Sequence, residues 1–126
     1  MRMQKSGKNY PKRGEIYIAD LDPAYGREMH KKRPVLIISN NSLNEILPTI
    51  IMIPFSSIVP LDMGPDFVKF LNQKYLDKES TLVVNQLGAI DKVRLIKKIG
   101  KISKIKLREV EEAAKLVLGI IEYDNN

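Results

Sequence analysis

Two short apolar runs lie near the middle of the chain: PVLIIS at residues 34–39 and TIIMIP at residues 49–54. Each run is too short for a buried helix, and each is bounded by Pro, Asn or Ser. We therefore predict that both are central strands of a sheet.

Shorter strand patterns flank these two runs. EIYIADL at residues 15–21 is rich in β-branched and aromatic residues and stops at Asp22-Pro23. Further strands are predicted at residues 63–70, where the alternation is less clean, at 80–85 and at 93–99. About five or six short strands with regular turn signals favour a barrel-like sheet.

The period changes after Ser103, a plausible N-cap. Apolar residues then recur at three- and four-residue intervals with Glu and Lys between them, which predicts an amphipathic helix. Strands first and one main helix last give an α+β fold class. The apolar positions are Val110, Ala113, Ala114, Val117, Leu118 and Ile121.

Length and composition narrow the class of protein. With 126 residues, 44% hydrophobic and 29% charged, we expect one domain over 13–126, preceded by a basic flexible arm over 1–12. No apolar run could span a bilayer, so we expect a cytoplasmic protein without membrane contact. No cysteine and a single histidine argue against a metal site. A net charge of +6 favours a polyanionic partner, although excess lysine also serves solubility.

The segment YGREMHKKRP at residues 25–34 concentrates charge between two predicted strands. A loop held at both ends by a sheet can present cations to a phosphate backbone, and Glu28 can orient one of them. The alternative is a solvated basic loop without a partner, and His30 is by itself more typical of an ordinary surface residue. The candidate residues are Arg27, Glu28, His30, Lys31, Lys32 and Arg33.

Polar side chains at predicted strand ends are further candidates. Thr49 opens a strand after Pro48, where its hydroxyl could donate to a phosphate oxygen, although on local sequence alone strand propensity explains it better. Ser56 and Ser57 are also explained by turn chemistry. The adjacent amides of Asn85-Gln86 could read the edges of unstacked bases, although a turn would use them too.

An ordered series of motifs from Arg13 to Tyr123 resembles the MazF/PemK toxin family. No single motif is specific, but their order and spacing agree along nearly the whole domain. The matching motifs are RGEIY at 13–17, DLDP at 20–23, Gly26-x-Glu28, RPVLII at 33–38, Pro48-Thr49, Pro54-x-Ser56-Ser57, Gln86, Ile90-Asp91-Lys92-x-Arg94-Leu95 and LGII at 118–121.

The resemblance implies an SH3-like small β-barrel of about five to seven mostly antiparallel strands with a C-terminal helix. It implies a homodimeric, metal-independent endoribonuclease without cofactors, which cuts single-stranded RNA, mRNA in particular, at short motifs. The products would be 2′,3′-cyclic phosphate and 5′-hydroxyl ends, and cleavage would arrest translation and growth. A cognate antitoxin, acidic, partly disordered and MazE-like, would block the RNA groove, and operator DNA would be reached only through that antitoxin.

The resemblance also assigns roles to residues. Arg33 and Thr49 take the two catalytic positions, and we favour charge stabilisation over proton transfer for Arg33 because arginine stays protonated. If a general base is needed, Glu28 or His30 is nearest in sequence. The expected RNA-binding residues are Arg27, Lys31, Lys32, Ser56, Ser57, Asn85 and Gln86.

The chain departs from the family pattern at residues 29–32. Many relatives have small residues there, whereas this chain has Met, His and two Lys, and it has Arg27 where serine is common.

Two other functions stay open. A gyrase-binding toxin shares the barrel but uses a C-terminal tryptophan, which this chain lacks. An RNA-binding module would need the basic surface but not the reactive pair.

Overall fold

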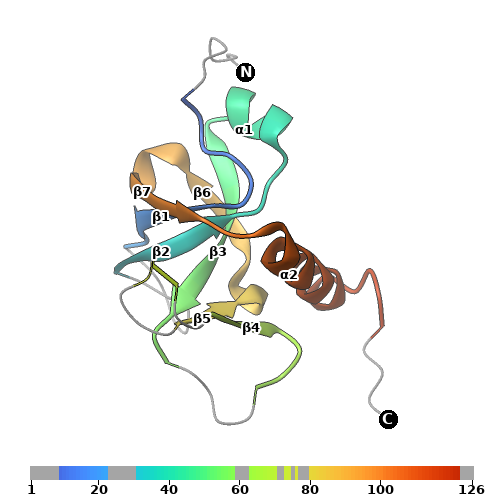
Figure 1. The fold of residues 1–126 in the computed structure, drawn as a ribbon. Helices are drawn as coiled ribbons and strands as arrows, with labels where there is room; N and C mark the ends of the chain where they lie inside the picture. The colour runs from blue at the N-terminus through green and yellow to red at the C-terminus, as the bar shows by residue number, and fades with distance from the viewer. Residues whose placement is uncertain are drawn as a thin grey trace.

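The computed structural model describes residues 9–22, 31–58, 63–70, 73, 74, 76 and 80–122. A curved antiparallel sheet and a C-terminal helix beside it make up this part of the protein (Figure 1). None of its helices is long and apolar enough to cross a membrane. In chain order the elements are β1 Glu15–Asp20, β2 Lys32–Ile37, α1 Asn41–Ile46, β3 Thr49–Ser56, β4 Phe67–Phe70, β5 Ser80–Val83, η1 Val84–Gln86, β6 Gly88–Asp91, η2 Lys92–Arg94, β7 Leu95–Lys101 and α2 Lys104–Val117.

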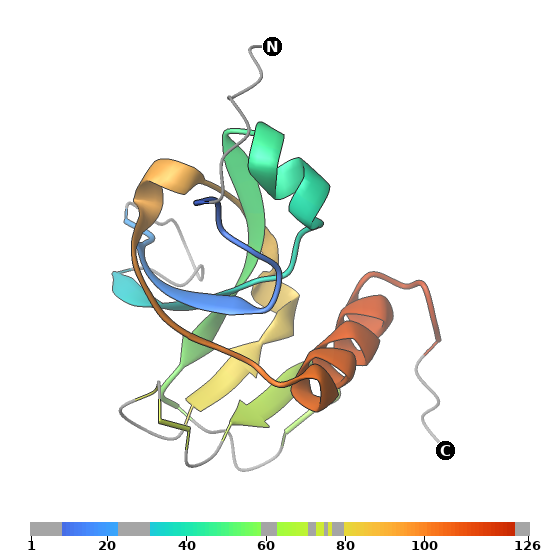
Figure 2. The same cartoon turned by 45° about the horizontal axis from the view of Figure 1, so that its top comes forward.

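Strand β3 connects the two parts of the sheet. Its first half pairs with β6, its middle pairs with β2, and its last two residues, Phe55 and Ser56, pair with β5. The strand order is β4-β5-β3-β2-β1-β7, with β6 attached to β3. Figure 2 shows the resulting curvature, with β7 on the outside and α2 beside β4. The predicted α+β fold with a small antiparallel barrel and a C-terminal helix is confirmed, although the described order does not close into a ring.

Several boundaries differ from the sequence predictions. The stretch 80–85 is strand only to Val83, after which a 3-10 turn carries Asn85 and Gln86. The short helix α1 and strand β6 were not predicted, because a six-residue helix and a four-residue strand carry too little periodicity. The predicted C-terminal helix is confirmed, and the Ser103 side chain caps it by accepting from Lys106 N at 3.1 Å. The helix ends at Val117, so Leu118 and Ile121, which were predicted on its apolar face, lie beyond it and are exposed.

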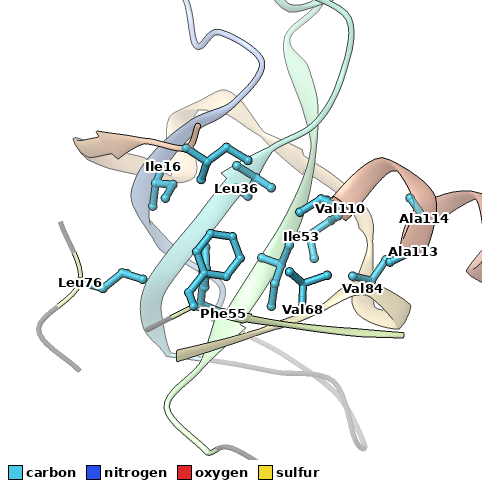
Figure 3. Close-up of a cluster of buried hydrophobic side chains, with 13 residues drawn as sticks. Ile16, Leu36, Ile53, Phe55, Val68, Leu76, Val84, Val110, Ala113 and Ala114 are labelled. Carbon is cyan, nitrogen blue, oxygen red and sulfur yellow. The ribbon is translucent and has the colours of Figure 1, made fainter. Parts of the chain in front are cut away.

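The first of the two central runs, which forms most of β2, is continuously apolar because β2 is buried on both faces. Leu36 belongs to one core cluster, whereas its neighbours Val35 and Ile37 belong to another. A strand covered on both faces has no polar side and so shows no alternation. In Figure 3 the first cluster fills the space between β2, β3 and the α2 side chains Val110 and Ala113.

Helix α1 is attached to the sheet by a buried amide. Asn44 is fully buried; its Nδ2 donates to Ser39 O at 2.9 Å, and its Oδ1 accepts from Ser39 Oγ at 2.5 Å. Ser39 Oγ in turn accepts from Ile51 N at 2.9 Å. This chain of hydrogen bonds links α1 to β3 near its start.

We expect Asn44→Ala to lower the free energy of unfolding by about 2 to 3 kcal/mol, because buried polar groups of Ser39 lose their partners and a small cavity opens. Urea denaturation measures the loss. Ser42→Ala, at an exposed position of the same helix, should change stability by less than about 0.5 kcal/mol. Equal effects of the two substitutions would contradict this role for Asn44.

A buried carboxylate ties the N-terminal segment to β1 and β7. Glu15 Oε1 accepts from Lys12 N at 2.8 Å and from Tyr17 Oη at 3.3 Å, and Oε2 pairs with Lys98 Nζ at 2.7 Å. Burial by itself raises the pKa of Glu15, but the hydrogen bonds and the charge of Lys98 outweigh it and hold that pKa below its usual value. The carboxylate therefore stays ionised in the folded protein.

Glu15→Gln should destabilise the protein most at neutral pH. The folded pKa lies below the ordinary value of 4.5, so the ionised carboxylate stabilises the fold above about pH 4.5 and loses this effect as the pH falls through the folded pKa. Urea denaturation of both proteins at stepwise lower pH should show the gap in unfolding free energy shrinking. A gap that does not change with pH would show that Glu15 acts through packing alone.

Candidate functional site

A basic pocket opens where β2, the end of β3 and β7 come together. Its volume is about 550 Å³. Four cationic side chains and three serines line it, and none of its described lining residues is acidic. Five residues that the sequence singled out are among them. The lining comprises Ile18, Lys31, Lys32, Arg33, Pro34, Phe55, Ser56, Ser57, Leu76, Ser80, Lys97 and Ile99.

Arg33 is held in this pocket by the backbone of β3. It is half-buried, and its Nη1 donates to Phe55 O at 3.1 Å. Burial lowers the pKa of Arg33. The ordinary pKa of arginine is so high that the guanidinium nevertheless remains a cation. A cation that is partly removed from water interacts more strongly with an incoming anion than a fully solvated one does.

A serine lines the same pocket as Arg33. β2 and β3 are antiparallel with Val35 opposite Pro54, so the start of β2, which carries Arg33, lies near the end of β3, which carries Ser56, and both residues line the pocket. Ser56 Oγ accepts from Ile58 N at 3.1 Å, which orients the hydroxyl so that its O–H can donate to a ligand. Arg33 and Ser56 therefore present donors to one common volume.

Hydrogen bonds hold Lys31, just before β2, against the two residues that follow β1. Lys31 N donates to Asp22 Oδ1 at 2.9 Å, and Leu21 N donates to Lys31 O at 3.2 Å. Arg94 donates from Nη1 to Asp20 O at 3.1 Å and also to Asp22 O. Lys31 and Lys32 therefore enter the pocket from a fixed point of the backbone.

Lys97 is a site residue that sequence reasoning missed. It lies on β7 opposite Ile18 of β1, and both line the pocket. Ile99 lies two residues further on the same face, so alternation along β7 was an available signal. Nothing in the local sequence showed which face of β7 would meet Arg33, about 60 residues away along the chain.

The structure does not bring Arg33 and Thr49 together within one chain. Thr49 is exposed at the opposite end of β3, where it pairs with Asp91 of β6. Ser56 lies seven positions further along the extended strand, which corresponds to roughly 23 Å. A single phosphate cannot bridge that distance, so within one chain Thr49 lies outside the pocket that holds Arg33.

The predicted amides also lie away from the pocket. Asn85 and Gln86 are in η1, at the other end of β5 from Ser80. Asn85 Nδ2 donates to Asp66 Oδ2 at 2.5 Å, and Gln86 Nε2 donates to Asn85 Oδ1 at 3.1 Å. Both amides thus serve a turn. Three further candidates lie outside the described residues: Arg27, Glu28 and His30.

Comparisons with known proteins agree with this architecture. A family model described as PemK-like, MazF-like toxin of type II toxin-antitoxin system matches residues 12–118. The endoribonuclease MazF of Staphylococcus epidermidis is 35% identical over 116 residues, which cover 91% of this chain and 97% of that protein.

Solved structures show the same fold at lower identity. MazF from Deinococcus radiodurans superposes with a TM-score of 0.77 at 19% identity, over 89% of this chain and 99% of that one. A mycobacterial endoribonuclease in complex with its cognate antitoxin superposes with a TM-score of 0.73 at 21% identity, over 90% and 99% of the two chains.

A small antiparallel barrel with a C-terminal helix and a basic, serine-lined pocket defines a class of compact protein suited to binding polyanions. This chain belongs to the PemK-like, MazF-like toxins of type II toxin-antitoxin systems. The predicted family and the prediction of an endoribonuclease are confirmed at this level.

Proposed function

We propose that this toxin cleaves single-stranded RNA in the basic pocket, without a metal ion, with Arg33 and Ser56 acting on the reacting phosphate. The observation that carries the proposal is the meeting of a half-buried guanidinium and an oriented hydroxyl in a pocket lined by Lys31, Lys32 and Lys97. Ser56 here takes the part that the family resemblance assigned to Thr49.

The chemistry suited to this pocket is transesterification within the RNA. The 2′-oxygen forms a bond to the adjacent phosphorus and loses its proton, the bond from phosphorus to the 5′-oxygen breaks, and the departing 5′-oxygen takes up a proton. The products are a 2′,3′-cyclic phosphate and a 5′-hydroxyl. Negative charge grows on the non-bridging oxygens as the new bond forms, and fixed donors aimed at those oxygens lower the barrier.

Arg33 supplies the largest part of that stabilisation. Its guanidinium is already oriented by Phe55 O, so little reorganisation accompanies the reaction. Ser56 donates a second hydrogen bond to the same phosphate. A permanent cation is a poor proton acceptor, so the general base is a different group, for which Glu28 and His30 remain the sequence-based candidates.

Metal independence is supported by the choice of side chains. Among the described residues no three of His, Asp or Glu cluster as they would to hold a metal ion, and the pocket's described lining offers only cations and neutral donors. Such a lining repels a divalent cation and attracts phosphate directly. The charge stabilisation that a metal would supply is then provided by Arg33 and the lysines.

A pocket with four cations also suits an acidic partner. Relatives have been solved with an antitoxin, as the mycobacterial complex and the MazE–MazF complex of Deinococcus radiodurans show. We propose that an acidic, partly disordered antitoxin segment occupies this pocket in the inhibited state, that the toxin acts as a homodimer in the cytoplasm, and that mRNA cleavage arrests translation. A gyrase-binding role has no support in the pocket, and a binding module without cleavage would not need the oriented Ser56.

The decisive experiment incubates a long unstructured RNA with purified protein in EDTA and maps the cut ends. We expect cuts at a short motif with 5′-hydroxyl ends. Arg33→Ala should lose about 100- to 1000-fold in rate, as removal of a transition-state donor does elsewhere, and Ser56→Ala should lose at least about tenfold. Thr49→Ala should stay within about twofold of the unaltered protein.

Thr49→Ala serves as the matched control for Ser56→Ala, because both remove a hydroxyl from an end of the same strand. Circular dichroism and thermal unfolding verify that each variant is folded. Loss of cleavage in Thr49→Ala with full activity in Ser56→Ala would reverse the assignment. An RNA left intact by the folded, unaltered protein, with or without EDTA, would refute the nuclease proposal and favour the binding module.

A further inference from the structure

A second pocket lies on the other face of the ribbon formed by β1 and β7. Its volume is about 420 Å³. Ile18 opposite Lys97 and Tyr17 opposite Lys98 are successive pairs across these two strands, so their side chains point to opposite faces. The first pair lines the Arg33 pocket and the second pair lines this one. The second pocket is lined by Asn9, Tyr10, Pro11, Lys12, Glu15, Tyr17, Lys92, Leu95 and Lys98.

The second pocket carries a net positive charge. Three lysines line it against one carboxylate, Glu15, which is already bound to Lys98 at 2.7 Å and shielded from solvent. The other two lysines, Lys12 and Lys92, come from separate segments, one before β1 and the other in η2. Cations from two segments that converge on one hollow favour a phosphate over an isolated counterion.

Aromatic rings accompany these cations. Lys12 Nζ lies 4.4 Å from the centroid of the Tyr10 ring, and Tyr17 is held by its hydrogen bond to Glu15 at 3.3 Å. Both rings are half-buried and hence restricted in motion. Aromatic rings beside lysines are the combination that binds single-stranded nucleic acid, because a base stacks on a ring while its phosphate meets a cation. An acidic peptide would need the lysines but not the rings.

The environment of Lys92 points the same way. Burial lowers the pKa of Lys92, although the nearby Glu45 acts in the opposite direction. A lysine that is partly desolvated gains more from an added anion than a fully hydrated lysine does, because its charge is less screened. Lys92 is therefore, with Lys12, one of the cations that an entering phosphate would meet in this pocket.

We infer that this second pocket binds a nucleotide of single-stranded RNA that flanks the cleaved bond. The inference rests on the proposed nuclease function and extends its substrate beyond the Arg33 pocket. Strand β7 is the last strand in the described sheet order, so the RNA can pass over its exposed edge from one face of the ribbon to the other. Lys97 would contact the RNA on the face of the Arg33 pocket, and Lys98 would contact it on the face of the second pocket.

The test compares two mixed-sequence 2′-O-methyl RNA oligonucleotides that cannot be cleaved, one of about 5 and one of about 12 nucleotides, chosen within the range of known single-strand site sizes. Fluorescence anisotropy measures affinity at several salt concentrations. The longer RNA should bind the unaltered protein more tightly. In amide NMR spectra it should shift the signals of Tyr10, Lys12 and Lys92, which the shorter RNA should leave in place.

Lys92→Gln should remove most of the advantage of the longer RNA. We expect about a fivefold loss of affinity for that RNA and a fall of about 0.7 in the salt slope, as for one lost phosphate contact on a single strand. Tyr10→Leu should lower the same affinity with little change in the salt slope. Lys104→Gln is the matched control, because it removes one exposed lysine from the start of α2, outside both pockets.

Equal affinity for the two lengths, or an equal loss in Lys104→Gln, would overturn the second site and leave the nuclease proposal intact. Shifts at Tyr10 and Lys92 caused by poly-glutamate but not by RNA would also overturn it, in favour of an acidic protein partner. Neither oligonucleotide can be cut, so this binding test does not depend on cleavage. If the protein lacked nuclease activity and the length effect remained, only the cleavage proposal would be refuted.

Discussion

The split pairing of β3 is the constraint on which the rest of the molecule depends. One strand bonds to β6, β2 and β5 in turn, so it must leave one part of the sheet and enter the other within eight residues. Phe55 occupies the end of this passage. Its side chain is buried, and its ring lies edge-on to the Phe70 ring with the two ring centroids 5.1 Å apart. Its backbone carbonyl accepts a hydrogen bond from Arg33. The same residue thus belongs to the hydrophobic core and positions the guanidinium.

The position of Phe55 explains how a small domain can hold a cation rigidly. Arg33 depends on a backbone acceptor that the core fixes, and not on a long polar network of its own. The residues around it are supplied by strands from different parts of the chain, with Ser56 from β3 and Lys97 from β7. A β-strand alternates its side chains between faces, so the β1–β7 ribbon offers a basic surface on each side.

Much of the site was predictable where function depends on local charge. The lysines and arginine at residues 31–33 are consecutive around the start of β2, and their common location follows from being adjacent in the chain. The hydroxyl was different. Thr49 and Ser56 both lie at an end of β3, and local propensity and turn chemistry describe them equally well. Only the antiparallel pairing with β2 shows that the end of β3 with Ser56, and not the end with Thr49, lies near Arg33. That pairing depends on contacts between strands that are distant in the chain.

The sequence alone was enough for the two central strands, the amphipathic helix with its Ser103 cap and the family, because each of these depends on residues close together in the chain or on their order. The tertiary structure decided the pairing of β3 with three strands, the meeting of Arg33 with Ser56 and Lys97, and the existence of two pockets back to back. These features depend on contacts between segments far apart in sequence, which the core alone brings into register.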